Sequence, residues 1–219
     1  MSRVTPPCGA FPTDIPVGKH PQRGVTVTTM TAAVSHPLRQ RIVAAAVELT
    51  TASGWAHVTM ARLAEQVGVS RQTVYNEIGT KPALAEAMIL AELDRFLAAV
   101  ESAFDRHPDD LPEAIRAAAG AVLELAQDNR LLHAVVSATH GADTELLPLL
   151  TTHAESLLAA AKLVVAERVA PYDVPLDPAH LEAAIDIIVR VVLSHVMQPS
   201  GTPDRTAADI AWIAARVLH

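Results

Sequence analysis

The sequence predicts an all-α protein of nine helices. Three observations lead to this fold class: Ala and Leu dominate after about residue 34, apolar residues recur at helical spacings, and strand-like alternation is absent. Half of the 219 residues are apolar and 19% are charged, which is typical of a globular chain. No apolar run is long enough to span a bilayer and the first residues lack a secretory apolar segment, so we expect a cytoplasmic protein with no membrane partner.

Residues 1–34 form the least regular part of the chain. They contain scattered Gly and Thr, no helical or strand period, and five prolines: Pro6, Pro7, Pro12, Pro16 and Pro21. Such a segment cannot bury enough apolar surface to fold alone, so we predict a disordered, proline-rich tail.

Capping residues set the bounds of the predicted helices. A Ser or Thr directly before a segment with helically spaced apolar residues predicts the start of a helix, and a Gly directly after that segment predicts its end. On this basis the first three helices are expected at residues 35–53, 60–67 and 70–77, with Thr59 and Ser70 as caps and Gly54, Gly68 and Gly79 at their ends. Thr80, with Pro82 in the first turn, opens a long helix to about Phe104. Further helices fit residues 111–127, 129–139, 145–170, 178–197 and 204–218, separated by Pro-, Gly- and Asp-containing breaks.

The segment between Thr59 and Gly79 has the pattern of a helix-turn-helix. Its apolar residues can converge on the first helix, and a turn at Gly68 presents the second short helix outward. On that helix Val74 and Ile78 are four residues apart and point inward. The pair Gln72 and Asn76 therefore shares a second face, and the pair Arg71 and Tyr75 shares a third.

The side chains on these two faces suit double-stranded DNA. The amides of Gln72 and Asn76 match the N6/N7 edge of adenine, and Arg71 can fork onto guanine or hold a phosphate. Donors suited to phosphate oxygens come from Ser70, Thr73, Tyr75 and Lys81, and from the free amides of the helices capped by Thr59 and Thr80. Solvated polar residues and ordinary caps are the structural alternative for any one of these, but that account is weak for the whole array.

The charge distribution agrees with this interpretation. The net charge is −7, yet residues 1–81 carry eight Lys and Arg against four Asp and Glu, while residues 82–219 carry nine against twenty. The basic part of the chain is therefore the part that contains the helix-turn-helix.

Residues 58–84, VTMARLAEQVGVSRQTVYNEIGTKPAL, resemble the DNA-binding segment of TetR-family transcriptional repressors. The resemblance implies a two-domain, nine-helix fold, with a DNA-binding domain at 35–80 and a ligand-binding and dimerisation domain at 81–219. It implies that Arg71, Gln72 and Thr73 read bases, while Thr59, Tyr75 and Lys81 contact the backbone. The sequence departs from the family at Glu77 and Ile78, where His and Phe are common, and a carboxylate at position 77 would be repelled by phosphate.

Two C-terminal helices are candidates for a dimer interface. Helix 178–197 is apolar almost all the way round, so it needs cover on more than one side. Burial in a single core is one explanation; we favour a homodimer in which both helices pack against their copies, because this presents two recognition helices to a palindromic operator. The expected interface consists of Ile185, Ile188, Val192, Val196, Ile210, Trp212, Ile213 and Val217.

Residues 82–170 are rich in Ala, Val and Leu, so a pocket there would have aliphatic walls and favour a small apolar effector. The candidate pocket residues are Phe96, His133, Ser137 and His140. We expect no cofactor and no metal, because the His spacings match no metal motif. The sequence therefore predicts a ligand-responsive repressor.

Two alternatives remain. A helical enzyme could pair His133 or His140 with Asp143 or Glu145, but the chain has no nucleophile elbow and no phosphate-binding Gly loop. A DNA-independent ligand carrier would use the same pocket without residues 36–81.

Overall fold

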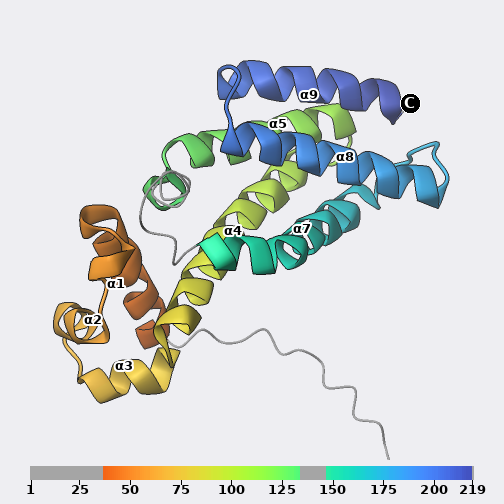
Figure 1. The fold of residues 1–219 in the computed structure, drawn as a ribbon. Coiled ribbons are helices and arrows are strands. Elements are labelled where there is room, and N and C mark those ends of the chain that lie inside the picture. The colour runs from red at the N-terminus through yellow and green to blue at the C-terminus, as the bar shows by residue number, and fades with distance from the viewer. Residues whose placement is uncertain (1–36, 134–146, 219) are drawn as a thin grey trace, which may run out of the picture. The chain divides into compact units, whose positions relative to one another are not determined.

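The structure is a computed structural model that describes residues 37–133 and 147–218. Within these ranges every regular element is a helix, which confirms the all-α prediction (Figure 1). The elements are α1 (Pro37–Ser53), the 3₁₀ helix η1 (Trp55–His57), α2 (Met60–Val67), α3 (Arg71–Ile78), α4 (Lys81–Arg106), α5 (Leu111–Gln127), α7 (Leu147–Val169), α8 (Pro178–Met197) and α9 (Pro203–Val217).

Most predicted bounds agree with these helices. The bounds of α2, α5 and α8 match the prediction, α3 and α4 each extend one or two residues further, and α9 lies one residue earlier. The helix expected at 129–139 is described only for residues 130–133, and the expected tail, residues 1–34, lies outside the described residues. The short helix η1 was not predicted; it buries Trp55 beneath the helix-turn-helix.

Local hydrogen bonds explain where the N-terminal helices begin and end. The hydroxyls of Thr59, Ser70 and Thr80 accept from the amides of Arg62, Thr73 and Ala83 at the starts of α2, α3 and α4. Gly68 ends α2 with φ of 76°, a left-handed conformation in which its amide donates to Ala64 and Glu65. The chain therefore turns sharply enough for α3 to cross α2.

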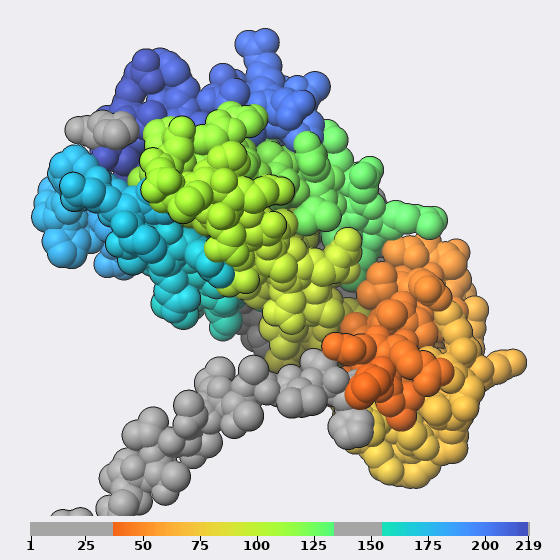
Figure 2. All heavy atoms as spheres, turned by 180° about the vertical axis from the view of Figure 1, so that it is seen from behind, coloured from red at the N-terminus to blue at the C-terminus, as the bar shows by residue number. Residues whose placement is uncertain are grey.

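Buried residues form two apolar clusters, and α4 belongs to both. The first cluster joins α1, η1, α2 and α3 to the early residues Leu84, Ala85, Ala87 and Met88 of α4. The second joins the late residues Val100, Ala103 and Phe104 to α5, α8 and α9. In the space-filling view the surface of α1 to α3, in orange and yellow, adjoins the first turns of α4, whereas α5 and α7 flank the rest of it (Figure 2).

Ion pairs fix α7 and α8 around the later part of α4. The Arg168 guanidinium lies 2.8 Å from Asp105 and 3.1 Å from Glu101, both on α4. Asp186 on α8 accepts from Lys162 at 2.9 Å and from Arg190 at 2.7 Å, and these hydrogen bonds hold the pKa of its carboxyl below the usual value. In the part of the chain that the structure describes, no helix is long and apolar enough to cross a membrane.

We predict opposite effects for alanine at two glycines. Gly68→Ala should lower the free energy of unfolding by about 1 kcal/mol, because a Cβ meets no atom there but must adopt the left-handed conformation. Gly120→Ala should raise it by up to about 1 kcal/mol, because Ala is the better helix former and its Cβ would lie 3.6 Å from that of Ala207, an ordinary contact. Urea unfolding followed by circular dichroism measures both changes. The prediction would be contradicted if both variants changed the free energy of unfolding in the same direction.

Candidate nucleic-acid interface and internal cavity

The helix-turn-helix presents α3 on a buried apolar base. Val74 and Ile78 lie in the first apolar cluster, with 0% and 6% of their surfaces exposed. The Ser70 hydroxyl accepts from the Thr73 amide at 3.0 Å and shares a hydrogen bond with the Thr73 hydroxyl at 2.8 Å. The orientation of α3 is thus set by packing on one side and by its cap.

The outward side of α3 carries two hydrogen-bonded pairs of exposed side chains. Gln72 Nε2 donates to Asn76 Oδ1 at 2.9 Å, so the two amides lie side by side as the spacing predicts. Arg71 Nη2 donates to the Tyr75 hydroxyl at 3.3 Å, and its guanidinium lies 5.4 Å from the centre of the Tyr75 ring. Each amide keeps unused donors and acceptors, so the pair can still bind a base edge.

The remaining predicted phosphate contacts lie at helix N-termini. Thr59 and Thr80 are exposed caps of α2 and α4, and Lys81 is the first residue of α4. The Lys81 ammonium lies 4.8 Å from the centre of the Trp55 ring, which holds the charge beside η1. These residues lie at the N-termini of α2 and α4, the helices before and after α3, and their contacts with DNA stay a prediction.

Sequence reasoning missed the arginines that hold this part of the chain together. Arg39 donates to the Glu77 main-chain oxygen at 2.7 Å, Arg41 to the Val67 oxygen at 2.8 Å, and Arg62 to the His57 oxygen at 3.0 Å. The first two contacts join α1 to the ends of α3 and α2. A cation beside these carbonyls also interacts favourably with the helix dipole.

An apolar cavity of about 460 Å³ lies between α4, α5, α7 and α8. Phe96, a predicted pocket residue, lines it, together with Leu, Ile, Val and Ala side chains. Among the described residues only Glu92 and Asn129 bring polar groups to the lining. Neither was predicted as a pocket residue, although Asn129 stands at the start of the helix expected at 129–139.

Of the predicted polar anchors, only His133 is described, and it does not line this cavity. His133 is exposed, its Nε2 lies 2.8 Å from the Gln127 main-chain oxygen, and it lines a separate cavity with His195. The other two candidates, Ser137 and His140, lie outside the described residues. His133 therefore lies outside the lining of the cavity that Phe96 lines, and its role in ligand binding stays a prediction.

The residues of the predicted dimer interface lie in different environments within the protomer. Ile185 and Ile210 are buried in the protomer's own second cluster, while Ile188, Val192 and Val196 line the apolar cavity. Of the predicted set, only the α9 residues Trp212, Ile213 and Val217 are exposed, by 58%, 50% and 46%. On α8 the exposed apolar residues are Ile187, Val191, Leu193 and Met197, and the last two also line the cavity. Periodicity could not distinguish these faces because apolar side chains surround most of α8.

A helix-turn-helix with an outward polar helix, joined by one long helix to a helical domain with an apolar cavity, defines a class of DNA-binding regulators. Two family models match the chain: "Bacterial regulatory proteins, tetR family" at residues 42–88, and "Bacterial Tetracyclin repressor, C-terminal domain" at residues 110–216. The chain belongs to the TetR family of transcriptional regulators, and it has the family's two-domain all-α fold.

Several relatives are similar over most of the chain. The HTH-type transcriptional regulator AlkX of Mycobacterium tuberculosis is 28% identical over 175 residues, which are 80% of this chain and 82% of that protein. The crystal structure of the TetR-family repressor AlkX from Dietzia sp., implicated in biodegradation of n-alkanes, matches with a TM-score of 0.66 and 26% identity, covering 81% of this chain and 96% of that one. A putative TetR-family regulator from Mesorhizobium loti shares the fold, with a TM-score of 0.60 at 15% identity over 82% and 96% of the two chains. These similarities favour a DNA-binding repressor over the enzyme and carrier hypotheses.

We predict that the stability of the protein depends on the capping hydrogen bond of Ser70. A second capping residue at this position should therefore preserve stability better than a residue that cannot cap. Ser70→Ala should lower the free energy of unfolding by about 1 kcal/mol, because the Thr73 amide loses its acceptor. Ser70→Asp should change it by less, since Asp is an equally good cap. Thermal unfolding of both variants measures the difference; equal losses would show that the cap is not what Ser70 contributes.

Proposed function

We propose that this protein is a homodimeric repressor that binds a palindromic operator and is released from it by a small apolar ligand. The observation that carries the proposal is the exposed, hydrogen-bonded array on α3 above the buried residues Val74 and Ile78. A helix that only packed would not need to order four large polar side chains toward solvent.

In this proposal the four residues Arg71, Gln72, Thr73 and Asn76 read bases in the major groove. Phosphates are bound by Thr59, Ser70, Thr80 and Lys81 at the starts of α2, α3 and α4, and by Tyr75 within α3. We assign the DNA-binding domain to residues 35–80 and the ligand-binding and dimerisation domain to 81–219. The first turns of α4 complete the apolar cluster of the smaller domain, so the boundary lies at a continuous helix.

The dimer would form through the outer faces of α8 and α9. Ile187 and Val191 are one helical turn apart on α8, and Trp212, Ile213 and Val217 continue the exposed apolar surface on α9. Burying large apolar side chains of this kind is the main favourable term in association. An isologous pairing would hold the two recognition helices about 34 Å apart, one turn of DNA.

The effector would bind in the apolar cavity, and α4 would carry its effect to the DNA-binding domain. Ile89, Leu93 and Phe96 line the cavity within about two turns after Met88, which packs with Leu84 under α1 to α3. Leu131 forms a second connection, because it lines the cavity and also belongs to the first apolar cluster. The Dietzia relative is implicated in biodegradation of n-alkanes, which supports an aliphatic effector here. Typical coupling energies of ~1–3 kcal/mol would lower operator affinity about 5- to 150-fold.

The test is a mobility-shift assay on the DNA that flanks the gene. The wild-type protein should give a salt-sensitive shift, and footprinting should reveal a palindrome. Gln72→Ala should cost about 1–3 kcal/mol and relax base preference at one position, whereas Lys81→Ala should weaken all sequences alike and reduce the salt slope by about one. Absence of any shift at low ionic strength would refute the proposal.

Dimerisation can be tested separately. Ile187→Glu and Ile213→Glu should each convert the protein to a monomer, because each places two charges in an apolar interface. Leu90→Glu, at an exposed Leu on α4, is the matched control and should leave a particle of twice the 23.2 kDa chain mass. Light scattering after gel filtration measures these masses, and a dimer that survives both changes would exclude this interface.

A further inference from the structure

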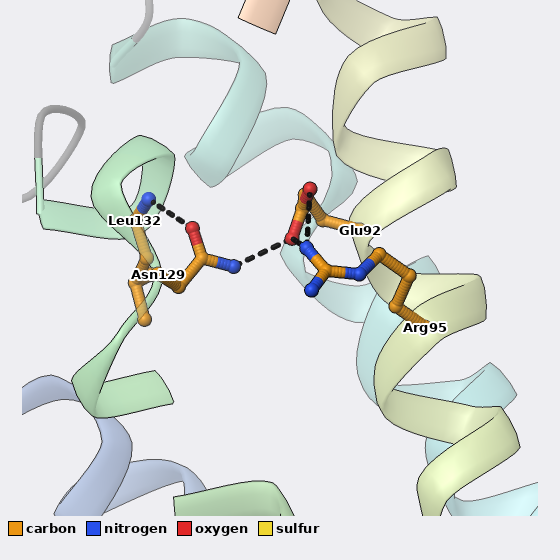
Figure 3. Close-up of polar contacts among 4 residues, drawn as sticks. All are labelled: Glu92, Arg95, Asn129 and Leu132. Carbon is orange, nitrogen blue, oxygen red and sulfur yellow. Dashed lines mark hydrogen bonds and ion pairs between the residues drawn. The ribbon is translucent and has the colours of Figure 1, made fainter. Parts of the chain in front are cut away.

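The polar residues of the apolar cavity form one connected group. Asn129 Nδ2 donates to Glu92 Oε2 at 2.5 Å, and Asn129 Oδ1 accepts from the Leu132 amide at 2.8 Å. Arg95, one turn after Glu92 on α4, donates to both carboxylate oxygens at 3.0 and 3.2 Å. Figure 3 shows Asn129 reaching from the chain after α5 toward the Glu92 carboxylate, with Arg95 on the carboxylate's other side.

Burial distinguishes these side chains. Asn129 is 8% exposed and the Glu92 side chain 17%, whereas the Arg95 side chain is 61% exposed. Arg95 and Asn129 also line a second, more polar cavity of about 430 Å³ with Arg106 and Asp128. Glu92 and Asn129 therefore stand at the border between an apolar and a polar space, with Arg95 on the polar side.

The group has unused hydrogen-bonding capacity. A carboxylate accepts about four hydrogen bonds, and Glu92 receives three, two from Arg95 and one from Asn129. An amide nitrogen has two hydrogens, and Asn129 uses one of them toward Glu92. One acceptor site on Glu92 and one donor hydrogen on Asn129 thus remain, on two side chains that are already in contact. A hydroxyl group can fill both, because it donates one hydrogen bond and accepts another.

We infer that Glu92 and Asn129 form a seat for the hydroxyl end of an aliphatic effector, so that the cavity selects a chain ending in an alcohol. The inference rests on the proposed function, since it takes the cavity to be the effector site. The hydroxyl donates to Glu92 and accepts from Asn129, while the chain lies among the aliphatic side chains. A carboxylate-ended chain offers only acceptors and a like charge to Glu92, and an alkane leaves both polar groups unused.

Calorimetric titration of the full-length protein at neutral pH tests this with octanol, octanoate and octane, which share one chain. Octanol should bind roughly tenfold or more tightly than octanoate, and more tightly than octane. Glu92→Gln keeps the side-chain shape and an acceptor for Asn129 but removes the charge. Octanoate should therefore bind more tightly, and the preference for octanol over octanoate should fall by about tenfold.

Three further variants separate the seat from general effects. Glu86→Gln removes an exposed carboxylate from the same helix outside the cavity lining and should leave the octanol preference unchanged. Val192→Ala, on the apolar wall, should weaken all three ligands by a similar factor. Asn129→Ser keeps a capping side chain but removes the amide donor. It should therefore lower the affinity for octanol toward the affinity for octane.

The outcomes distinguish the two proposals. Octanoate or octane binding the wild type as tightly as octanol would overturn the seat while leaving an apolar effector in place. An octanol preference that Glu86→Gln lowers as much as Glu92→Gln would overturn it as well. Binding of none of the three would overturn the apolar effector of the proposed function together with the seat, while the DNA-binding assay would still stand on its own.

Discussion

A single continuous helix, α4, is the constraint on which the rest of this structure depends. Its 26 residues rise about 39 Å, and they contribute first to the apolar cluster beneath the helix-turn-helix and then to the cluster of the larger domain. A packed helix moves as a rigid element, since close-packed side chains resist gradual deformation. A change in packing around Phe96 is therefore expected to act on Leu84 and Met88 through the same helix, and with them on the base on which α3 rests.

Small side chains explain how so much helix packs around so few aromatic residues. Phe, Trp and Tyr make up 3% of the chain, and α5 is buried through many alanines, with Gly120 facing Ala207 on α9. α5 packs against both α9 and α4, while aliphatic side chains from α4, α5, α7 and α8 line a cavity. Unfilled apolar space reduces stability, and a ligand that fills it restores those contacts, which gives an apolar effector its driving force.

Local signals in the sequence predicted the helices and the recognition array, while long-range contacts were not predictable. Thr59, Ser70 and Thr80 act on amides three residues away, so their roles follow from spacing alone. The Glu92–Asn129 hydrogen bond joins residues 37 apart, and no period connects them. The same limit applied to α8, where apolar residues on all sides concealed that Ile188 and Val192 face the cavity and Ile187 faces solvent.

If the cavity binds the effector as proposed, Asn129 connects ligand selection to the response through its position in the chain. Its side chain joins Glu92 on α4 and also accepts from the Leu132 amide, and Leu131 between them packs into the cluster under the helix-turn-helix. In the inferred site, a ligand hydroxyl uses the remaining donor of Asn129 and the remaining acceptor of Glu92, so it adds hydrogen bonds to those that hold this turn against α4. A ligand that only fills apolar space adds no hydrogen bond there and acts through side-chain packing alone. Because an equilibrium shifts only by the difference in a ligand's affinity for two states, the polar end of an effector determines how strongly it can act as well as how tightly it binds.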